Sequence, residues 1–170
     1  MKLLIPSAKE LNEQARIVEP QPLSENTKTI LQALKAFSLE ELATFYGISE
    51  ERAQVEKERI EALLAGSAKT YPSLELFDGL MYRSIERQDL SEKEQAYLQE
   101  HLLITTALYG VLPAYEGIAP HRLDFMMKLK PAGKSLKVLW KEDYDRAVED
   151  EEQILSLLSS EFEQVFSKAI

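Results

Sequence analysis

The sequence predicts an α/β fold in which a small mixed sheet is covered by helices, with a helix-rich N-terminal half. Strand-like apolar segments occur at residues 2–5, 102–110 and 154–158, and helical patterns fill most of the chain between them. Buried strands that are separated by helical stretches are typical of an α/β architecture. The 170 residues fit one domain, which at this size buries roughly 70% of the surface of the unfolded chain.

The N-terminal half opens with a strand and then turns helical. Residues 2–5 form a short apolar segment that ends at Pro6. After a polar connector, Ser24 is placed to cap a first helix. The apolar side chains of this helix recur at helical spacing: Ile30, Leu31, Leu34 and Phe37. One strand and one helix are therefore expected before residue 38.

Two further helices are expected next. Ser38 and Glu41 have the S-x-x-E spacing of a capping box, which predicts a helix that ends at Gly47. Ser49 is placed to cap a third helix, which runs to about Ala65. These two helices form a predicted hairpin around Gly47.

A fourth helix is expected from Pro72. Its apolar residues fit a helical period: Leu74, Phe77, Leu80, Met81 and Ile85. Ser91 and Glu94 form a second capping box, and the helix that they open leads into the central strand.

The middle of the chain holds the predicted core of the fold. β-branched and aromatic residues ended by Gly and Pro predict a buried strand at residues 102–110, followed by a bend at residues 113–120. A second short strand is expected at residues 121–127. In such a strand Arg122 and Asp124 would share a face and could form a buried ion pair.

The C-terminal part is predicted to hold a helix, a strand and the start of another helix. Residues 136–154 have an apolar start and an acidic outer face, which is typical of a helix on the surface. Residues 154–158 are strand-like, and a helix start follows at Ser159 or Ser160.

Composition excludes several classes of protein. The chain has no cysteine, which rules out disulfides, thiolate metal sites and a cysteine nucleophile. No apolar run approaches the ~18 residues that span a bilayer, and the N-terminus lacks the apolar stretch of a signal peptide. We therefore expect a cytoplasmic protein that is neither secreted nor inserted in a membrane.

Charge is unevenly distributed along the chain. The net charge of −9 argues against a surface that attracts nucleic acid everywhere. Residues 121–141 nevertheless hold six Lys and Arg against one Asp, whereas residues 142–163 hold nine acids against one Arg. A basic segment is thus followed by an acidic one, and both could equally be ordinary solvated faces.

Five stretches match, in chain order, the motifs of one family. The central stretch is His101 followed by LLITTALYGVLP and, after the bend, Pro120 to Met126. It resembles the YaaA peroxide-stress-resistance family, whose motifs read roughly HL..LSGLYGVLRP and PYRLEM at these places. The other matching stretches are Leu3 to Lys9; Phe77, Gly79 and Tyr82; Leu139 with Trp140; and Leu158 to Phe162.

The chain also departs from the family pattern. The family's PYR is Pro120-His121-Arg122 here, and Asp124 replaces its Glu. Members of the family usually continue further, with a basic segment that has no counterpart in this sequence. We therefore expect one domain over residues 1–170 that is an N-terminal fragment or a shortened form of the family.

The resemblance implies a protein that acts under hydrogen peroxide stress, limits free iron and binds DNA through a positively charged cleft, without catalysis or a cofactor. The expected DNA contacts are Lys9, Gly47, Ser49, Arg122, Lys128 and Lys130. The residues that match the family motifs are Ser7, Lys9, Tyr109, Gly110, Arg122 and Asp124. Because the family's basic C-terminal part is missing, DNA binding by this chain is expected to be weak.

The hairpin around Gly47 has two interpretations. Gly47-Ile48-Ser49-x-x-x-Ala53 resembles the helix-hairpin-helix motif, which offers backbone N–H groups to phosphate, although Ser49 replaces its second glycine. Alternatively, Gly47 only caps the helix before it. A helix-turn-helix that reads the major groove is rejected, because residues 49–61 hold five acids against three basic residues.

Two other functions stay open. An enzyme of unknown reaction is one, although no known catalytic motif is present. Its site residues would be Ser7, Lys9, Tyr109, Arg122 and Asp124. Iron sequestration is the other, with His101 and Glu94 on one helix face. Because the E-x-x-H spacing of di-iron helices is absent, His101 and His121 are interpreted as structural or surface residues, and no metal site is predicted.

Overall fold

The computed structural model describes residues 1–168 and confirms the α/β prediction. Its centre is a four-stranded mixed sheet in the order β4-β3-β1-β6. β1 pairs in parallel with both β3 and β6, and β4 returns antiparallel to β3. The strands of this sheet are β1 (Lys2–Pro6), β3 (Leu102–Thr106), β4 (Gly110–Pro113) and β6 (Ile154–Ser156). A separate antiparallel pair is formed by β2 (Tyr71–Pro72) and β5 (Gly117–Ile118).

The two middle strands, β1 and β3, are the apolar centre of the sheet. All five residues of β3 are buried, as are Leu4 and Ile5 of β1. In the register of the pair, Leu4 lies beside Leu103 and Ile5 beside Ile104. A parallel strand that is covered on both faces needs a continuous apolar run rather than alternation. Each of the buried Leu and Ile side chains among them contributes roughly 1.5–3 kcal/mol to stability.

Three capped helices fill the N-terminal half, as the sequence predicted. The hydroxyls of Ser24, Ser38 and Ser49 each accept a hydrogen bond from the backbone N–H three residues later, a cap that contributes about 1 kcal/mol. Gly47 ends the second helix with φ of 63°, a left-handed conformation that glycine adopts without strain. The helices are α1 (Glu25–Lys35), α2 (Leu39–Tyr46) and α3 (Glu50–Ala65).

The prediction of one continuous helix from Pro72 is wrong. The chain forms two single turns instead, α4 (Ser73–Leu76) and α5 (Leu80–Arg83). The Ser73 hydroxyl donates to the carbonyl oxygens of Pro113 and Ala114, and this tertiary contact fixes the first turn. Phe77 then takes an extended conformation with ψ of 132°, which ends the helical period. As a result Leu80, which that period would bury, is 80% exposed.

The central strand is shorter than predicted, because the chain reverses within the apolar run. The helix α6 (Glu92–His101), opened by its predicted capping box, leads directly into β3. β3 ends at Thr106, whose hydroxyl accepts a hydrogen bond from the Tyr109 N–H at 2.7 Å. Gly110 then starts β4 with φ of 79°, and a Cβ there would lie 2.7 Å from the Trp140 ring. The turn and the close approach of the indole therefore both require glycine.

The second strand predicted in the central segment is also wrong, because the chain forms a loop there. The Asp124 carboxylate accepts hydrogen bonds from the N–H groups of Met126 at 2.9 Å and Met127 at 3.1 Å, which folds the backbone into a turn. The expected ion pair between Arg122 and Asp124 is absent from the part of the chain that the structure describes. Asp124 lies 3.3 Å from the Lys9 ammonium instead.

The helix predicted for residues 136–154 begins at the predicted residue but ends earlier, at Arg146. A 3₁₀ turn, η1 (Pro131–Gly133), precedes α7 (Leu136–Arg146). Beyond α7 the chain turns back to the sheet, where the Lys2 N–H donates to the Gln153 carbonyl at 3.0 Å and β6 begins. The strand and helix predicted after this point are confirmed as β6 and α8 (Ser160–Glu163).

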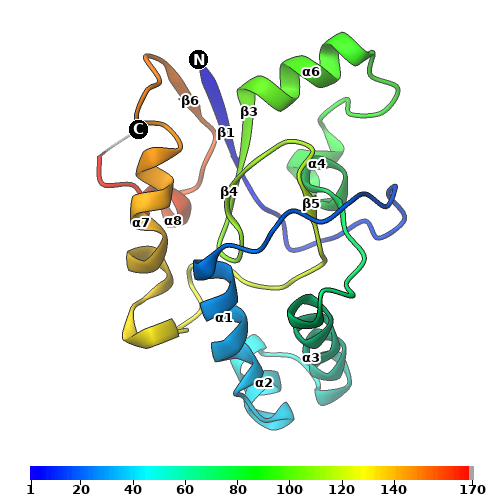
Figure 1. Cartoon of the computed structure of the whole chain (residues 1–170), viewed down its shortest axis with the longest axis vertical. Coiled ribbons are helices and arrows are strands. Elements are labelled where there is room, and N and C mark those ends of the chain that lie inside the picture. Colours follow the sequence, from blue (N-terminus) through cyan, green and yellow to red (C-terminus); the bar gives the residue numbers. More distant parts are fainter. Residues whose placement is uncertain (169–170) are drawn as a thin grey trace.

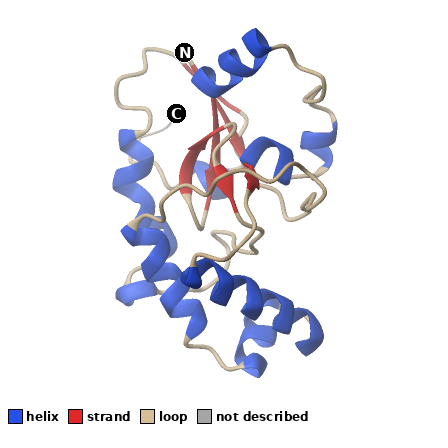
Figure 2. Ribbon diagram, turned by 45° about the vertical axis from the view of Figure 1, so that its right-hand side comes forward, coloured by secondary structure: helices blue, strands red, loops and turns tan. Residues whose placement is uncertain are grey.

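The helices surround the sheet in three groups, which Figures 1 and 2 show from two sides. In Figure 1, α7 and α8 lie on one side of the sheet, α4 and α6 on the other, and α1 to α3 form a group at one end of the molecule. Trp140 and Tyr144 of α7 reach into the core and donate hydrogen bonds to the carbonyl oxygens of Ala107 and Thr106. No helix within residues 1–168 is long and apolar enough to cross a lipid bilayer.

Candidate functional site

The order of the strands creates a crevice at one edge of the sheet. β1 lies between β3 and β6. After β1 the chain forms β3 and β4 on one side of it, and its last strand, β6, returns to the other side. The direction of winding therefore reverses at β1. In open α/β sheets, ligands bind outside the carboxyl ends of the strands at such a switch point. A cavity of about 210 Å³ lies there, between the residues that follow β1 and those that follow β6.

Three segments of the chain line this cavity, which we name the switch-point pocket. The first follows β1, the second is the loop after Pro120, and the third surrounds the start of α8. Four residues singled out in the sequence, Ser7, Lys9, Arg122 and Asp124, thus come together from distant parts of the chain. The lining residues are Pro6, Ser7, Ala8, Lys9, His121, Arg122, Leu123, Asp124, Met127, Ser159, Glu161 and Phe162.

Arg122 is a cation of this pocket that has no protein partner within residues 1–168. Its Nε atom is buried and makes no hydrogen bond. No carboxylate of the described chain lies within 4.0 Å of its guanidinium, whereas Lys9 and Arg59 nearby both have one. Buried donors without a partner are rare, because each costs about 1–3 kcal/mol. A water molecule, an ion or a ligand usually completes such a group.

Arg122 also reaches a buried charged cluster beneath α3. Tyr46, Glu56 and Arg59 line a void of about 10 Å³, the size of roughly one water molecule, which Arg122 borders too. Burial raises the pKa of the Glu56 carboxyl, and the positive charges of Arg59 and Arg122 oppose this rise. Glu56 accepts a hydrogen bond from Arg59 at 2.7 Å. Arg122 therefore connects the α2–α3 hairpin to the switch-point pocket.

Lys9 and Asp124 form an ion pair that lines the pocket. Their Nζ–Oδ2 distance is 3.3 Å, and the Lys9 side chain is 73% exposed whereas that of Asp124 is 15% exposed. Because the Lys9 end of the pair is open to water, the pair contributes only about 1 kcal/mol. The Lys9 ammonium can therefore exchange Asp124 for an anionic group of a ligand at little cost.

Two serine hydroxyls in the pocket have no hydrogen-bond partner in the described chain. Ser7 is held beside β3, because its backbone N–H donates to the Thr105 carbonyl at 2.9 Å. Ser159 precedes α8, and its side chain makes no cap hydrogen bond, unlike the serines before α1, α2 and α3. A hydroxyl can donate one hydrogen bond and accept two. Both serines can therefore bind a ligand without breaking a contact of the fold.

His121 is a buried, neutral imidazole between the pocket and the core. Its Nδ1 lies 2.9 Å from the Ala119 carbonyl oxygen, so Nδ1 carries the proton and Nε2 is an acceptor. Burial lowers the pKa of His121 to about 4. The ring packs edge-on against Phe77 and Tyr109, with centroid distances of 5.9 and 5.2 Å. These contacts hold the ring in place and leave Nε2 without a hydrogen bond in residues 1–168.

Tyr109 and Gly110 do not line the pocket. They contact residues of the core, Ala119 and Trp140. The Tyr109 hydroxyl accepts a hydrogen bond from the Ala119 N–H at 3.1 Å, and burial raises the pKa of this phenol. Gly110 lets the Trp140 ring close over the turn after β3. Both residues therefore act on the shape of the fold around the site.

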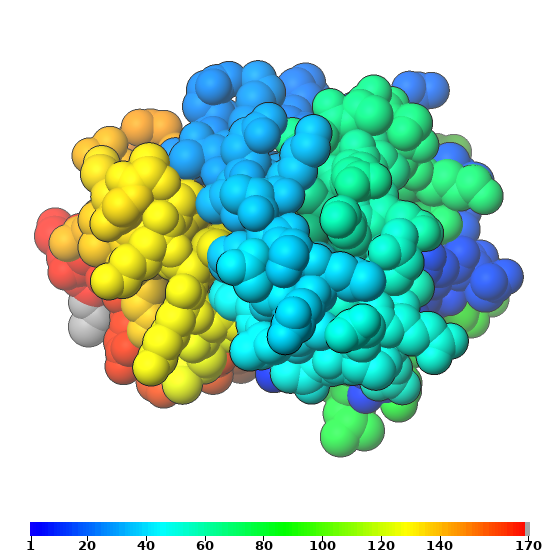
Figure 3. All heavy atoms as spheres, turned by 90° about the horizontal axis from the view of Figure 1, so that it is seen from below, coloured from blue at the N-terminus to red at the C-terminus, as the bar shows by residue number. Residues whose placement is uncertain are grey.

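The remaining predicted contacts lie outside the pocket. Lys128 and Lys130 are exposed on the chain that leads to η1, which packs against α1. Gly47 and Ser49 lie in the α2–α3 hairpin, and Figure 3 shows the η1 segment and this hairpin on one face of the molecule. The Gly47 N–H donates to the Thr44 carbonyl at 3.2 Å, so Gly47 serves as the helix cap that the sequence left as an alternative.

Sequence reasoning missed the third wall of the pocket. Glu161 accepts a hydrogen bond from the Phe125 N–H at 2.8 Å, which ties the start of α8 to the loop after Pro120. Phe162 packs edge-on against Phe125 with a centroid distance of 5.4 Å. Glu161 and Phe162 fall in a stretch that matches the family motifs, which was the signal that could have found them. No pattern in the sequence indicated that β1 and β6 are neighbouring strands.

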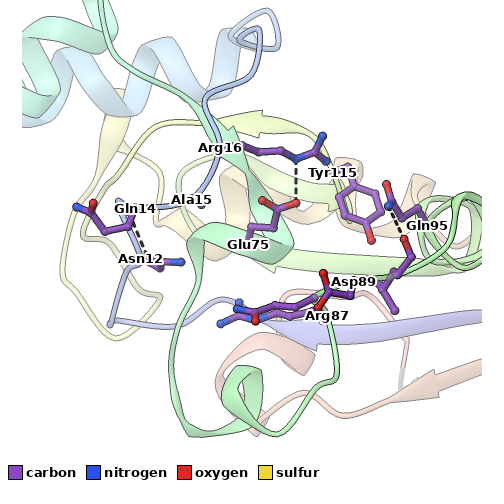
Figure 4. Close-up of a pocket in the computed structure, with 11 residues that line it drawn as sticks. Asn12, Gln14, Ala15, Arg16, Glu75, Arg87, Asp89, Gln95 and Tyr115 are labelled. Carbon is purple, nitrogen blue, oxygen red and sulfur yellow. Dashed lines mark hydrogen bonds and ion pairs between the residues drawn. The ribbon is translucent and has the colours of Figure 1, made fainter.

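A larger cavity, of about 540 Å³, lies between the extended chain after β1 and the loop before α6. Figure 4 shows the side chains that line it, among them Arg16 bonded to Glu75. Arg16 donates to Glu75 at 3.0 Å, and Arg87 donates to two backbone carbonyls and to Asp78. Only its Tyr115 hydroxyl, among the buried side-chain atoms described, lacks a partner. Because its cations are already bonded, we take the switch-point pocket as the candidate site.

The side chains described do not assemble a metal centre. Residues 1–168 contain no group of three or more His, Asp or Glu that could hold a metal ion. Glu94, weighed as an iron ligand, accepts hydrogen bonds from Ser91 in its capping box. His101 lies two helical turns away, with Nδ1 3.0 Å from the Met1 carbonyl oxygen. The two side chains therefore do not converge.

Comparison with known proteins gives matches over the whole chain. A family model described as peroxide stress protein YaaA matches residues 1–170. A UPF0246 protein of Streptococcus gordonii (strain Challis) is 57% identical over 170 residues, which are 100% of this chain and 70% of the relative. UPF0246 proteins of Streptococcus sanguinis (strain SK36) and Streptococcus pneumoniae serotype 2 (strain D39) are 57% and 55% identical over the same shares of each chain.

Proposed function

Because this chain belongs to the peroxide stress protein YaaA family, we propose that it is a cytoplasmic protein of the peroxide stress response that binds DNA without sequence preference. Its contacts would be made to the sugar-phosphate backbone, since such contacts position a protein but read no sequence. Bound protein would limit the damage that peroxide and free iron cause to DNA. Iron is a partner only in this indirect sense.

The observation that carries this proposal is Arg122, a cation in a cavity that has no carboxylate partner in residues 1–168. A guanidinium binds a phosphate through two parallel hydrogen bonds, which makes arginine a preferred residue for such groups. Lys9 adds a second positive charge that only a weak exposed pair restrains. The Ser7 hydroxyl next to it can donate to a phosphate oxygen.

The basic face around the pocket extends this contact. Lys128 and Lys130 are exposed on a segment, residues 121–141, with a net charge of +5. η1 within this segment packs against α1, which brings the basic residues to the same face as the α2–α3 hairpin (Figure 3). The α2–α3 hairpin on this face carries exposed acids such as Glu40, Glu41 and Glu50, which repel phosphate, so the contacts would be made by the basic segment and the pocket.

A second candidate function, an enzyme, is favoured by one observation. The Ser7 hydroxyl has no partner in the described chain and lines the same pocket as Lys9 and the His121 ring. A serine of this kind would become a nucleophile only with a base close to it. Labelling with a fluorophosphonate probe and mass spectrometry tests this function. Specific modification of Ser7 supports an enzyme, and an unlabelled Ser7 argues for binding alone.

Fluorescence anisotropy of a labelled DNA duplex, titrated with the protein across a salt series, tests the DNA proposal. Four phosphate contacts, from Arg122, Lys9, Lys128 and Lys130, predict a slope of about −3.6 in a plot of log K against log salt concentration. Arg122→Leu and the double variant Lys128→Ala/Lys130→Ala should each weaken binding. Each phosphate contact that is removed should reduce the magnitude of the slope by about 1.

The matched control is Lys93→Ala. Lys93 is exposed on α6, which lies at the opposite end of the molecule from the α2–α3 hairpin in Figure 1. This variant should bind like the wild type, and two duplexes of unrelated sequence should bind equally well. Affinity that does not change with salt, or no binding at all, would contradict the proposed function.

A further inference from the structure

We propose that the switch-point pocket binds one nucleotide residue, with its base inside the cavity and its phosphate on Arg122 and Lys9. The inference rests on the proposed function where the nucleotide is part of a DNA strand. A free mononucleotide has the same chemistry. The experiment is therefore designed to separate these two sources.

The size and walls of the pocket fit a single ring system. Its volume of about 210 Å³ is below the roughly 300–1,000 Å³ of pockets for drug-sized ligands. Leu123, Met127 and Phe162 line it with apolar and aromatic atoms. Proteins that take a base out of a helix hold it in a small pocket, against apolar or aromatic side chains of this kind.

The polar groups of the pocket match the edge of a base. Glu161 uses Oε1 to hold the Phe125 N–H, and its other carboxylate oxygen makes no hydrogen bond within the described chain. The His121 Nε2 is a second acceptor, and the Ser159 hydroxyl can donate or accept. A base edge presents N–H donors and carbonyl acceptors together. It therefore needs acceptors as well as donors from the protein.

The mixture of charges excludes a simple anion as the best ligand. Two cations, Arg122 and Lys9, line the pocket together with two carboxylates, Asp124 and Glu161. Inorganic phosphate would use the cations and would be repelled by the Glu161 carboxylate. A nucleotide presents an anionic group at one end and neutral N–H groups at the other, so it can satisfy both sets at once.

An unpaired base is the form of nucleotide that costs least to bind from a strand. Extrusion of a paired base requires loss of its pairing and stacking, which costs a few kcal/mol. A base in a single-nucleotide bulge has already lost its partner. The pocket should therefore favour bulged DNA over fully paired DNA, whereas the contacts to the outer phosphates are the same for both.

The test compares a fully paired duplex with the same duplex that carries one bulged nucleotide. The wild type should bind the bulged duplex about tenfold more tightly, which is in the range of one stacked base. Ser159→Phe fills the cavity with a ring and breaks no hydrogen bond of the described fold. It should lose the preference for the bulge, so that it binds the bulged and the paired duplex equally well. Ser160→Phe, at the next position and outside the pocket lining, is the control and should keep the wild-type preference.

Isothermal titration with free deoxynucleoside monophosphates supplies the second arm, with wild type, Ser159→Phe and Arg122→Leu. If DNA does not bind but a mononucleotide does, and both variants lose it, the pocket proposal stands and the proposed function fails. If the wild type binds DNA without a preference for the bulged over the paired duplex, and no mononucleotide binds, the pocket proposal is overturned and the proposed function stands. Absence of binding in both arms overturns both.

Discussion

The switch-point pocket and the 540 Å³ cavity differ in what their charged side chains already bind. In the larger one (Figure 4), Arg16 is paired with Glu75, and Arg87 is bonded to Asp78 and to backbone carbonyls. In the switch-point pocket, Arg122 has no hydrogen bond at its buried Nε. The cations of the larger cavity hold loops together, whereas Arg122 keeps its capacity to bind a further group. The larger cavity also holds one buried group without a partner, the Tyr115 hydroxyl, so the cation Arg122 is what distinguishes the switch-point pocket.

Removal of a cation should therefore affect stability in the larger cavity and ligand binding in the switch-point pocket. Removal of a cation that is bonded to the protein leaves buried acceptors without a donor, which costs stability. Removal of a cation that has no partner takes away a ligand contact and leaves the fold nearly unchanged. Three substitutions of cations test this contrast, and substitutions at His121 and Glu56 sharpen it, in order from the largest expected effect to the smallest.

Arg87→Ala should lower the free energy of unfolding by about 3 kcal/mol, because it leaves the Asp78 Oδ1 atom and two carbonyl groups without their donor, although Arg83 still donates to Asp78 Oδ2. The Arg87 side chain is only 11% exposed, so water replaces it poorly. Urea unfolding followed by circular dichroism measures this. DNA affinity of the folded variant should equal that of the wild type, and a loss of stability below about 1 kcal/mol would refute the contrast.

His121 should make stability depend on pH. Its pKa falls from an ordinary value of 6.5 to about 4 in the fold, so the unfolded chain binds the proton first. The stability that neutral His121 provides is complete above pH 6.5 and is lost as the pH falls toward 4. The loss should reach about 2 kcal/mol at pH 5 and about 3 kcal/mol at full protonation, which urea unfolding at a series of pH values measures.

His121→Gln should remove the rise of stability with pH between pH 5 and 6.5. Glu56 acts with the opposite sign, because burial raises its pKa in the fold. Its contribution to stability is present at low pH and is lost as the pH rises through the raised pKa. Glu56→Gln removes that contribution and serves as the control. An unchanged slope in His121→Gln would show that other groups cause the dependence.

Arg122→Leu should change the free energy of unfolding by no more than about 1 kcal/mol, although Arg122 is partly buried. The variant removes an unsatisfied donor, and this gain offsets the lost attraction to Glu56. Urea unfolding should thus separate it clearly from Arg87→Ala. A destabilisation as large as that of Arg87→Ala would mean that Arg122 is a structural cation.

Arg16→Ala should have the smallest effect, about 0–1 kcal/mol, because its pair with Glu75 is exposed to water. The Arg16 side chain is 57% exposed. Thermal unfolding and DNA titration should both be close to the wild type. A clear loss of DNA affinity in this variant would instead make the larger cavity part of the binding surface.

The helix starts were predictable because their causes are local. Ser24, Ser38, Ser49 and Ser91 each bond to a backbone N–H three residues later, so the interaction lies within one short stretch of sequence. Gly47 ends its helix for an equally local reason, the left-handed conformation of one residue. No distant contact is needed for these features.

Most of the errors occurred where a contact from a distant part of the chain decides the local structure. The fourth helix is broken by bonds from Ser73 to the chain after β4. The central strand reverses after Thr106 because Trp140, from α7, packs onto Gly110. The second central strand is replaced by a turn around Asp124, whose carboxylate also meets Lys9. The period of apolar residues along the sequence does not predict such long-range contacts.

The candidate site shows the same division. The residues that match the family motifs already included Ser7, Lys9, Arg122 and Asp124, which the fold brings into one pocket. The sequence alone also determined the α/β class, the capped helices and the family, because these follow from composition, period and motif. Only the tertiary structure decided that β6 lies beside β1, and hence that Ser159, Glu161 and Phe162 complete the pocket. That pairing joins the two ends of the chain through backbone hydrogen bonds, which carry no side-chain signal in a single sequence.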